Sequence, residues 1–487
     1  MTPLSKREIP FAVLLCLTLI TVELFVFPYR GITNDGRAYL AVSESPFSSD
    51  APAPYSNRLL APLIVHFLPF QHETGFRVVS SVSLFLLLAL GYIFLRRCRV
   101  SPTASGIVIA LFALSDVVLY NLQHPILVDP LSYLLILAAF LTIKEDRLFA
   151  ASVILTFAVL AKESALFVLP MFYFLDRGRE KLFDHESLKK TVLCSILPLT
   201  AYIAIYHTSA ESLPFNWVNI SLTRGAAPRL LFGTFGLLWL SSIGGISKAE
   251  RASMRMLFFI IFALVPIPFV TDTWRMLYLL FPVVLLFSGI YFDHIPGKEK
   301  YILIPIFTAG FIITNTEIAS NLLHIVLPGN SIAYAGTVIG ILLVPAPFLK
   351  EKWYIPALLS AVVIVGFIAL ELFLTSEFNR GVEALKGGKP YIAGKRFERV
   401  VAFHPDFIPA IVNLAVVRIN EGEIDDAERL FRQALSHSPN EPVLSFYLGS
   451  LLYQKGERQE AIRYLEKASS IPEAKRLCNE IKSNLTP

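Results

Sequence analysis

Six polar residues stand out because they interrupt or border long apolar runs and could do acid–base or anion chemistry. A carboxylate within hydrogen-bond reach can deprotonate an acceptor hydroxyl. Arginine and lysine can bind a phosphate and stabilise negative charge as it develops. We expect Asp35 to act as a general base, with Arg275 and Arg58 as phosphate ligands and Lys162 as a third. The whole predicted site comprises catalytic Asp35 and substrate-binding Arg58, Asp129, Lys162, Glu163 and Arg275.

The acidic candidates also have ordinary structural interpretations. Asp35 lies between Asn34 and Gly36, a setting typical of an Asx turn. Asp129 precedes Pro130 at the start of an apolar run, where an aspartate often caps a helix. If the fold brings Asp35 and Asp129 together, the two could instead share a divalent cation. The sequence has no closely spaced histidine or carboxylate cluster, so any metal stays unidentified.

The basic candidates have alternatives of their own. Arg58 could extend its head group to water from a helix lying at the membrane interface. Arg275 follows Trp274 and could anchor a helix at that interface. Lys162 and Glu163 are adjacent, so they could pair with each other at a helix break.

The chain that must position these residues has an unusual amino-acid composition. Of 487 residues, 54% are hydrophobic and only 17% are charged, whereas soluble proteins carry about 25% charged residues. This composition indicates a polytopic membrane protein. A net charge of +5 does not suggest nucleic-acid binding, and four cysteines exclude a disulfide scaffold.

A helix that crosses the hydrocarbon core needs about 20 mostly apolar residues. The run 148–175 is interrupted at Ala161-Lys162-Glu163-Ser164 and predicts two short helices. Counting it as two gives thirteen spans and makes each inside loop basic, with Lys6 and Arg7 placing the N-terminus in the cytoplasm. The C-terminal tail is then extracytoplasmic. The other predicted spans are 11–28, 78–95, 103–120, 126–143, 189–206, 230–246, 255–271, 274–292, 301–316, 331–348 and 354–374.

Charge density divides the chain into two predicted domains. Charged residues are as frequent in 376–487 as in an ordinary soluble protein, and they are far sparser in 1–375. The sequence therefore predicts an all-α protein, with a transmembrane domain over 1–375 and a soluble domain over 376–487.

The soluble tail repeats itself every 34 residues. The glycines Gly388, Gly422 and Gly456 recur at this spacing, and so do the alanines Ala393, Ala427 and Ala461. This pattern resembles the tetratricopeptide repeat, which is built from helix hairpins and has the same period. Such a tail either stabilises the protein by packing or offers a concave surface that docks a protein or glycan partner.

The polar residues of the apolar domain resemble those of the GT-C class of membrane glycosyltransferases, which includes protein O-mannosyltransferases and aminoarabinose transferases. The resemblance covers about residues 1–375 and rests on their placement. It implies a donor sugar linked to polyprenyl phosphate and a site at the extracytoplasmic membrane edge, which agrees with the predicted acid–base and phosphate chemistry. One departure is a lone aspartate followed by Gly36, where the mannosyltransferase branch has a paired Asp-Glu. The matching elements are Asp35 with Tyr39, Asn57-Arg58-Leu59 with Pro62, Ala161-Lys162-Glu163, and Trp274-Arg275 with Pro282.

Other functional classes fit less well. Transporters place charges near the bilayer midplane and often have two similar halves, whereas here the charges mark helix ends and no half-to-half repeat is visible. A glycan polymerase or ligase usually has a large late outer loop, but here the longest outer loop, 29–77, comes first. A scaffold would need only one span as an anchor.

Overall fold

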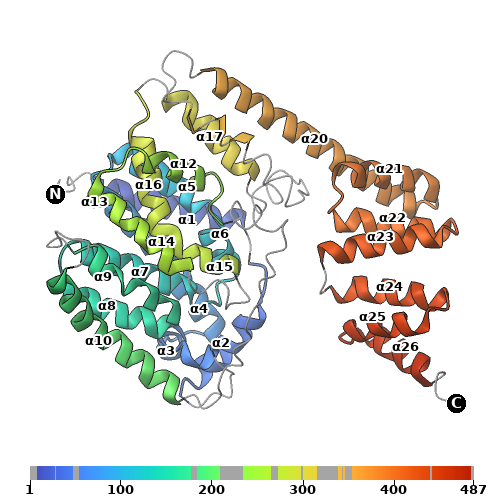
Figure 1. Ribbon diagram of the computed structural model, residues 1–487, viewed down its shortest axis with the longest axis horizontal. Coiled ribbons are helices and arrows are strands. Elements are labelled where there is room, and N and C mark those ends of the chain that lie inside the picture. The colour runs from blue at the N-terminus through green and yellow to red at the C-terminus, as the bar shows by residue number, and fades with distance from the viewer. Residues whose placement is uncertain are drawn as a thin grey trace. The chain divides into compact units, whose positions relative to one another are not determined.

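The computed structural model is all-α in the part of the chain that it describes (Figure 1). The chain divides into two compact units, a bundle unit that ends at Ile364 and a repeat unit formed mainly by Val365–Pro487. Helix α20 (Tyr354–Lys386) runs through the predicted domain boundary at 375 without a break. The described residues are 8–27, 29–47, 54–176, 184–208, 234–264, 273–297, 300–314, 338–339, 341–342, 344–345, 354–438 and 441–483.

Within these ranges, five helical segments are long and apolar enough to cross a membrane, which makes the chain a multi-pass membrane protein. A sixth is possible if α5 (Pro102–Ala113) and α6 (Asp116–Gln123), bent by 43°, form one broken span. The five are α1 (Glu8–Val26), α4 (His72–Arg97), most of α10 (His185–Thr208), the stretch Arg275–Asp293 and the later part of α20.

The prediction of thirteen spans is therefore wrong. Several of the apolar runs form helices of 7 to 16 residues, including α7 (Asp129–Lys144), α8 (Leu148–Ala161), α12 (Leu238–Ile246) and α14 (Phe258–Leu264). At about 1.5 Å per residue, they reach roughly 10–24 Å, less than the ~30 Å hydrocarbon core. Part of their apolar surface is buried within the bundle, as at Leu155 and Phe259, whereas Phe149 and Ile261 are exposed. The predicted span 331–348 lies mostly outside the described residues.

The interrupted run behaves as predicted. Helix α8 ends at Ala161, and Lys162 is extended, with φ −162° and ψ 128°. A 3-10 helix, η2 (Glu163–Val168), and a single turn, α9 (Met171–Phe174), follow. Because of this break, neither Lys162 nor Glu163 lies inside a continuous helix.

The described part of the long first loop contains two short α-helices. Helix α2 (Asn34–Glu44) is capped by Thr33, whose hydroxyl accepts a hydrogen bond from the Gly36 amide at 3.0 Å. A Cβ at Gly36 would lie 3.2 Å from the Ile126 carbonyl oxygen, so this glycine allows α2 to approach the segment before α7. The 3-10 turn η1 (Tyr55–Asn57) is followed by helix α3 (Leu60–Phe67), the short helix next to Arg58.

The remaining helices complete the bundle. Helix α8 packs against both α7 and α10, and α7 packs against α4. Helices α12 and α16 (Phe281–Asp293) pack closely at Gly245, where a Cβ would lie 1.8 Å from the Phe287 carbonyl oxygen. The bundle unit also contains α13 (Arg251–Met254), η3 (Arg255–Leu257), α15 (Thr273–Leu277), η5 (Tyr278–Leu280) and α17 (Lys300–Thr314).

The repeat unit consists of helix hairpins, drawn in orange to red in Figure 1. Gly388, Gly422 and Gly456 have φ values of +70°, +81° and +87°. Each ends a helix with the same pair of backbone hydrogen bonds: around Gly422, its amide bonds the Ile419 carbonyl at 3.0 Å and the next amide bonds the Arg418 carbonyl at 2.8 Å. The helices are the end of α20 with α21 (Pro390–Phe403), α22 (Ile408–Asn420) with α23 (Ile424–His437), α24 (Pro442–Gln454) with α25 (Arg458–Lys467), and α26 (Pro472–Ser483).

The aligned small residues form the contact between paired helices. Ala393, Ala427 and Ala461 are fully buried in one apolar cluster that also contains residues of α26. The predicted repeat is therefore confirmed by its turns and its core.

Candidate functional site

All six predicted site residues meet in one place, which we call the ionic cluster. They come from α2, the end of η1, the start of α7, the break after α8 and α15. Three carry negative charge and three carry positive charge, so the cluster is close to neutral when every group is ionised. It consists of Asp35, Arg58, Asp129, Lys162, Glu163 and Arg275.

Asp35 lies in the first turn of α2, where a negative charge suits the positive end of the helix. Its Oδ2 accepts a hydrogen bond from Arg275 Nη2 at 2.6 Å, and its Oδ1 accepts one from the Tyr55 hydroxyl at 2.9 Å. The carboxylate is therefore held by a cation on one side and a phenol on the other. This is not the Asx turn that the sequence also allowed.

Asp129 is the most deeply buried acid of the cluster, with 1% of its surface exposed. Its Oδ1 pairs with the Lys162 ammonium and accepts a hydrogen bond from the Tyr133 hydroxyl at 3.1 Å. Its Oδ2 lies 3.8 Å from Arg275 Nη1. The N-cap of α7 is Val128, and Asp129 is the first helical residue. The Asp129 carboxylate is therefore not the N-cap of α7, and it pairs with charged side chains instead.

Glu163 and Arg58 form a two-point ion pair. Arg58 Nε donates to Glu163 Oε2 at 2.8 Å, and Arg58 Nη2 donates to Glu163 Oε1. Arg58 Nη1 also donates to the Tyr39 hydroxyl at 2.7 Å. This parallel geometry orders both side chains, and it ties the first loop to the break after α8.

The structure does not agree with two of the alternative interpretations, a Lys162–Glu163 pair and an interface anchor at Arg275. Lys162 and Glu163 pair with Asp129 and Arg58, respectively, and not with each other. Arg275 is buried among acidic partners, which is not the setting of an interface anchor.

The environment of Asp35 sets its ionisation. Burial raises the pKa of this carboxyl, but hydrogen bonds from Arg275 and Tyr55 and the charge of Arg275 outweigh burial, so the pKa is lowered from its ordinary value. Asp35 is therefore ionised at neutral pH. While Arg275 holds it, the carboxylate is a weaker base than a free aspartate.

The ionic cluster is a poor fit for the divalent cation considered from the sequence. Asp35 and Asp129 share Arg275 as a partner, and Asp129 also binds Lys162. A metal ion placed between these carboxylates would meet two cations. Among the described residues, no group of three or more histidine, cysteine, aspartate or glutamate side chains could hold a metal.

Two tyrosines that contact the ionic cluster are not among the site residues predicted from the sequence. Tyr133 contacts Asp129, and Tyr55 contacts Asp35. The i, i+4 spacing of Asp129 and Tyr133 on one helix was an available signal, because such pairs face each other. Tyr55 comes from a separate turn, so spacing gave no indication of its contact.

Comparison with known proteins supports the C-terminal part of this picture. A family model described as tetratricopeptide repeat matches residues 418–473. No curated protein matches the chain. The chain is therefore a multi-pass membrane protein with a C-terminal tetratricopeptide repeat region.

Proposed function

We propose that the chain is a membrane glycosyltransferase of the GT-C type, which moves a sugar from a polyprenyl-phosphate-linked donor to an acceptor hydroxyl. The observation that carries the proposal is that six residues chosen for their chemistry gather in one cluster. Asp35, Arg275, Asp129 and Lys162 form one chain of ion pairs, although Asp35 and Arg275 are 240 positions apart. The Arg58–Glu163 pair lies close enough for Arg58 to interact electrostatically with both aspartates. Buried charges in a membrane protein are costly and mark functional sites by default.

The residue roles follow from the contacts. The donor phosphate binds Arg275 and displaces the Asp35 carboxylate from the guanidinium. Freed from this cation, Asp35 has a higher pKa and becomes a stronger base. It takes the acceptor proton while the acceptor oxygen bonds to the anomeric carbon and the bond from that carbon to the phosphate oxygen breaks. Polyprenyl phosphate leaves, with its charge stabilised by Arg275.

The other members of the ionic cluster line and position the substrate site. Lys162 and Asp129 hold one side of Arg275, since Asp129 contacts both cations. Arg58 and Glu163 fix the first loop against the α8 break. The phosphate-binding role of Arg58 requires one of its donors to leave Glu163 or Tyr39.

We place the ionic cluster on the extracytoplasmic face. Helix α7 starts at Asp129 in the cluster and ends at Lys144, and α4 starts near the cluster and ends at Arg96 and Arg97. The basic ends are expected in the cytoplasm by the positive-inside rule, which puts the cluster outside. We also propose that the repeat unit is extracytoplasmic and that it docks a protein or glycan acceptor.

The test is Asp35→Asn in the purified full chain, assayed for release of polyprenyl phosphate from a labelled donor. Loss of a general base predicts a fall of about 10²–10⁴-fold. Donor retention should stay equal or rise, because Arg275 no longer has Asp35 as a competitor for the phosphate. The control is Asp184→Asn, because Asp184 Oδ2 accepts the Ser187 amide at 2.8 Å and asparagine keeps such a bond.

Two results would count against the proposal. Unchanged release in Asp35→Asn would remove the base assignment. No release by the unaltered chain from any polyprenyl-phosphate sugar, together with ion-coupled uptake in vesicles, would favour a transporter.

A further inference from the structure

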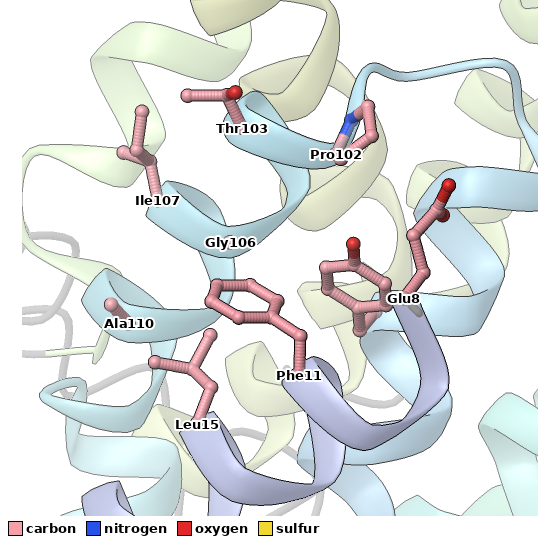
Figure 2. A pocket seen from close by; sticks show the side chains of 9 residues that line it. Glu8, Phe11, Leu15, Pro102, Thr103, Gly106, Ile107 and Ala110 are labelled. Atoms are coloured by element: carbon pink, nitrogen blue, oxygen red, sulfur yellow. The ribbon is translucent and has the colours of Figure 1, made fainter. Parts of the chain in front are cut away.

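A second feature lies at the other end of the bundle unit, in a cavity between α1, α4 and α5. Its volume is about 540 Å³, within the range of roughly 300–1,000 Å³ typical of ligand pockets. Figure 2 shows Phe11 and Leu15 of α1 facing Gly106, Ile107 and Ala110 of α5. Phe11 is exposed, so the cavity opens at the bundle surface, where hydrocarbon is the surrounding solvent.

The cavity has a polar end. Tyr92 of α4 is 1% exposed, and its hydroxyl has no hydrogen-bond partner among the described residues. A buried hydroxyl without a partner lowers stability, and an acceptor atom on a ligand would satisfy it. Glu8 lines the same cavity and pairs with Arg96 Nε at 2.9 Å.

The cavity lies at the end of α4 that is far from the ionic cluster. Phe76, near the start of α4, packs in the same apolar cluster as Tyr39, a partner of Arg58. Tyr92 comes 16 residues later, about 24 Å along the helix. Beyond it, α4 ends in Arg96 and Arg97, and Arg99 follows with 73% of its side chain exposed. Arg96 and Arg97 pair with Glu8 and Glu145. Arg99 lies 3.9 Å from Glu250 in a pair that is largely exposed, and exposed pairs are weak. An anionic group at this membrane surface can therefore replace Glu250 at Arg99.

We propose that this cavity binds one acyl chain of an anionic glycerophospholipid from the leaflet opposite the ionic cluster. The acyl chain of the lipid lies along Phe11, Leu15 and Ile107. The lipid's ester carbonyl accepts a hydrogen bond from Tyr92, and its phosphate faces the basic end of α4. The site is separate from the donor site and does not depend on the proposed transferase activity.

The experiment uses the full chain in lipid vesicles that contain phosphatidylglycerol with a diazirine on its acyl chain. After photolysis, digestion and mass spectrometry map the labelled peptides. We expect labelling concentrated on the lining segments of α1 and α5. Labelling spread evenly over the lipid-facing helices would overturn the proposal.

Two variants sharpen the test. Gly106→Phe fills the cavity, because a Cβ at Gly106 has only Leu15 and Phe11 carbons at 3.9 Å, and should reduce labelling there at least tenfold. The matched control is Gly366→Phe, on an exposed face of α20 with open space around its Cβ; it should leave labelling unchanged. Tyr92→Phe keeps the shape and removes one hydrogen bond, so it should reduce labelling several-fold. Labelling in Tyr92→Phe and Gly106→Phe that stays at the level of the unaltered chain would contradict the site.

Competing lipids distinguish the occupant. Unlabelled phosphatidylglycerol should suppress the labelling, and phosphatidylcholine should do so more weakly because it lacks net charge. If polyprenyl phosphate competes better than phosphatidylglycerol, the cavity belongs to an isoprenoid and the phospholipid proposal fails.

Discussion

At the scale of single residues, the guanidinium of Arg275 is shared between two carboxylates. It lies 2.6 Å from Asp35 and 3.8 Å from Asp129. The ionic cluster is close to neutral. A phosphate that binds Arg275 must therefore either replace one of its carboxylate partners or be repelled by both. Separating Asp35 from Arg275 costs less free energy than separating Asp129 from it. Asp35 is more exposed than Asp129, and it keeps the Tyr55 hydroxyl as a partner.

Tyr55→Phe should move the acidic limb of the pH profile of kcat/KM to higher pH. The Tyr55 hydroxyl donates to the Asp35 carboxylate and lowers its pKa. Without this bond the carboxylate is less favoured and takes up its proton at higher pH, and kcat/KM reports ionisation in the free enzyme. The measurement is donor turnover from pH 3 to pH 8; an acidic limb that stays in place or moves down would remove Tyr55 from the site.

The members of the ionic cluster could be selected from sequence, but their pairings could not. Charged residues inside apolar runs are rare enough to be chosen by type and position alone. The partner of each depends on how α2, α7 and the α8 break meet in three dimensions. Lys162 and Glu163 illustrate this, since adjacent residues on an extended break point to different partners.

At the scale of elements, hydropathy and helix length carry different information. Apolar runs predicted the existence of α1, α4 and α10 correctly. They did not separate spans from short buried helices, because a residue facing protein and a residue facing lipid are equally apolar. The stretch Arg275–Asp293 is almost entirely buried, so its apolar character reports packing as much as membrane.

The repeat unit was predictable in more detail, because its turns require a special residue. Only glycine adopts a positive φ without strain, so the regular recurrence of Gly388, Gly422 and Gly456 indicated both the turn and the period. The alanines at the matching positions likewise indicated where the paired helices pack closely.

Gly422→Ala should destabilise the repeat unit by about 1–2 kcal/mol, because an alanine at φ +81° is held in the left-handed region. Gly422→Asn should lose less, since asparagine tolerates this conformation better. Thermal unfolding of the full chain, followed by protease resistance of residues 390–483, measures both. Equal stability of the alanine variant and the unaltered chain would contradict the assigned turn.

At the scale of the whole molecule, orientation can no longer rest on counting spans, because the thirteen-span count is wrong. It rests instead on the ends of α4 and α7, which carry Arg96, Arg97 and Lys144 away from the ionic cluster. The side of the membrane on which the repeat unit lies is a proposal that needs its own measurement.

Single cysteines test the orientation directly. Phe47→Cys, at a position 81% exposed just after α2, should react with a membrane-impermeant maleimide added to intact cells. Arg99→Cys, also well exposed after α4, should react only after the membrane is opened. The reverse pattern would put the ionic cluster in the cytoplasm. A reporter fused after Pro487 assigns the tail in the same cells.

The most direct test of the proposed site is the mass of the lipid that stays bound to Arg275. Native mass spectrometry of the purified full chain should reveal a polyprenyl-phosphate sugar. Arg275→Ala should lose at least tenfold of it, whereas Arg255→Ala, which removes a hydrogen bond to the Asp176 backbone, should keep it. Absence of any isoprenoid mass, or equal retention in both variants, would contradict the assignment of the ionic cluster as a donor site.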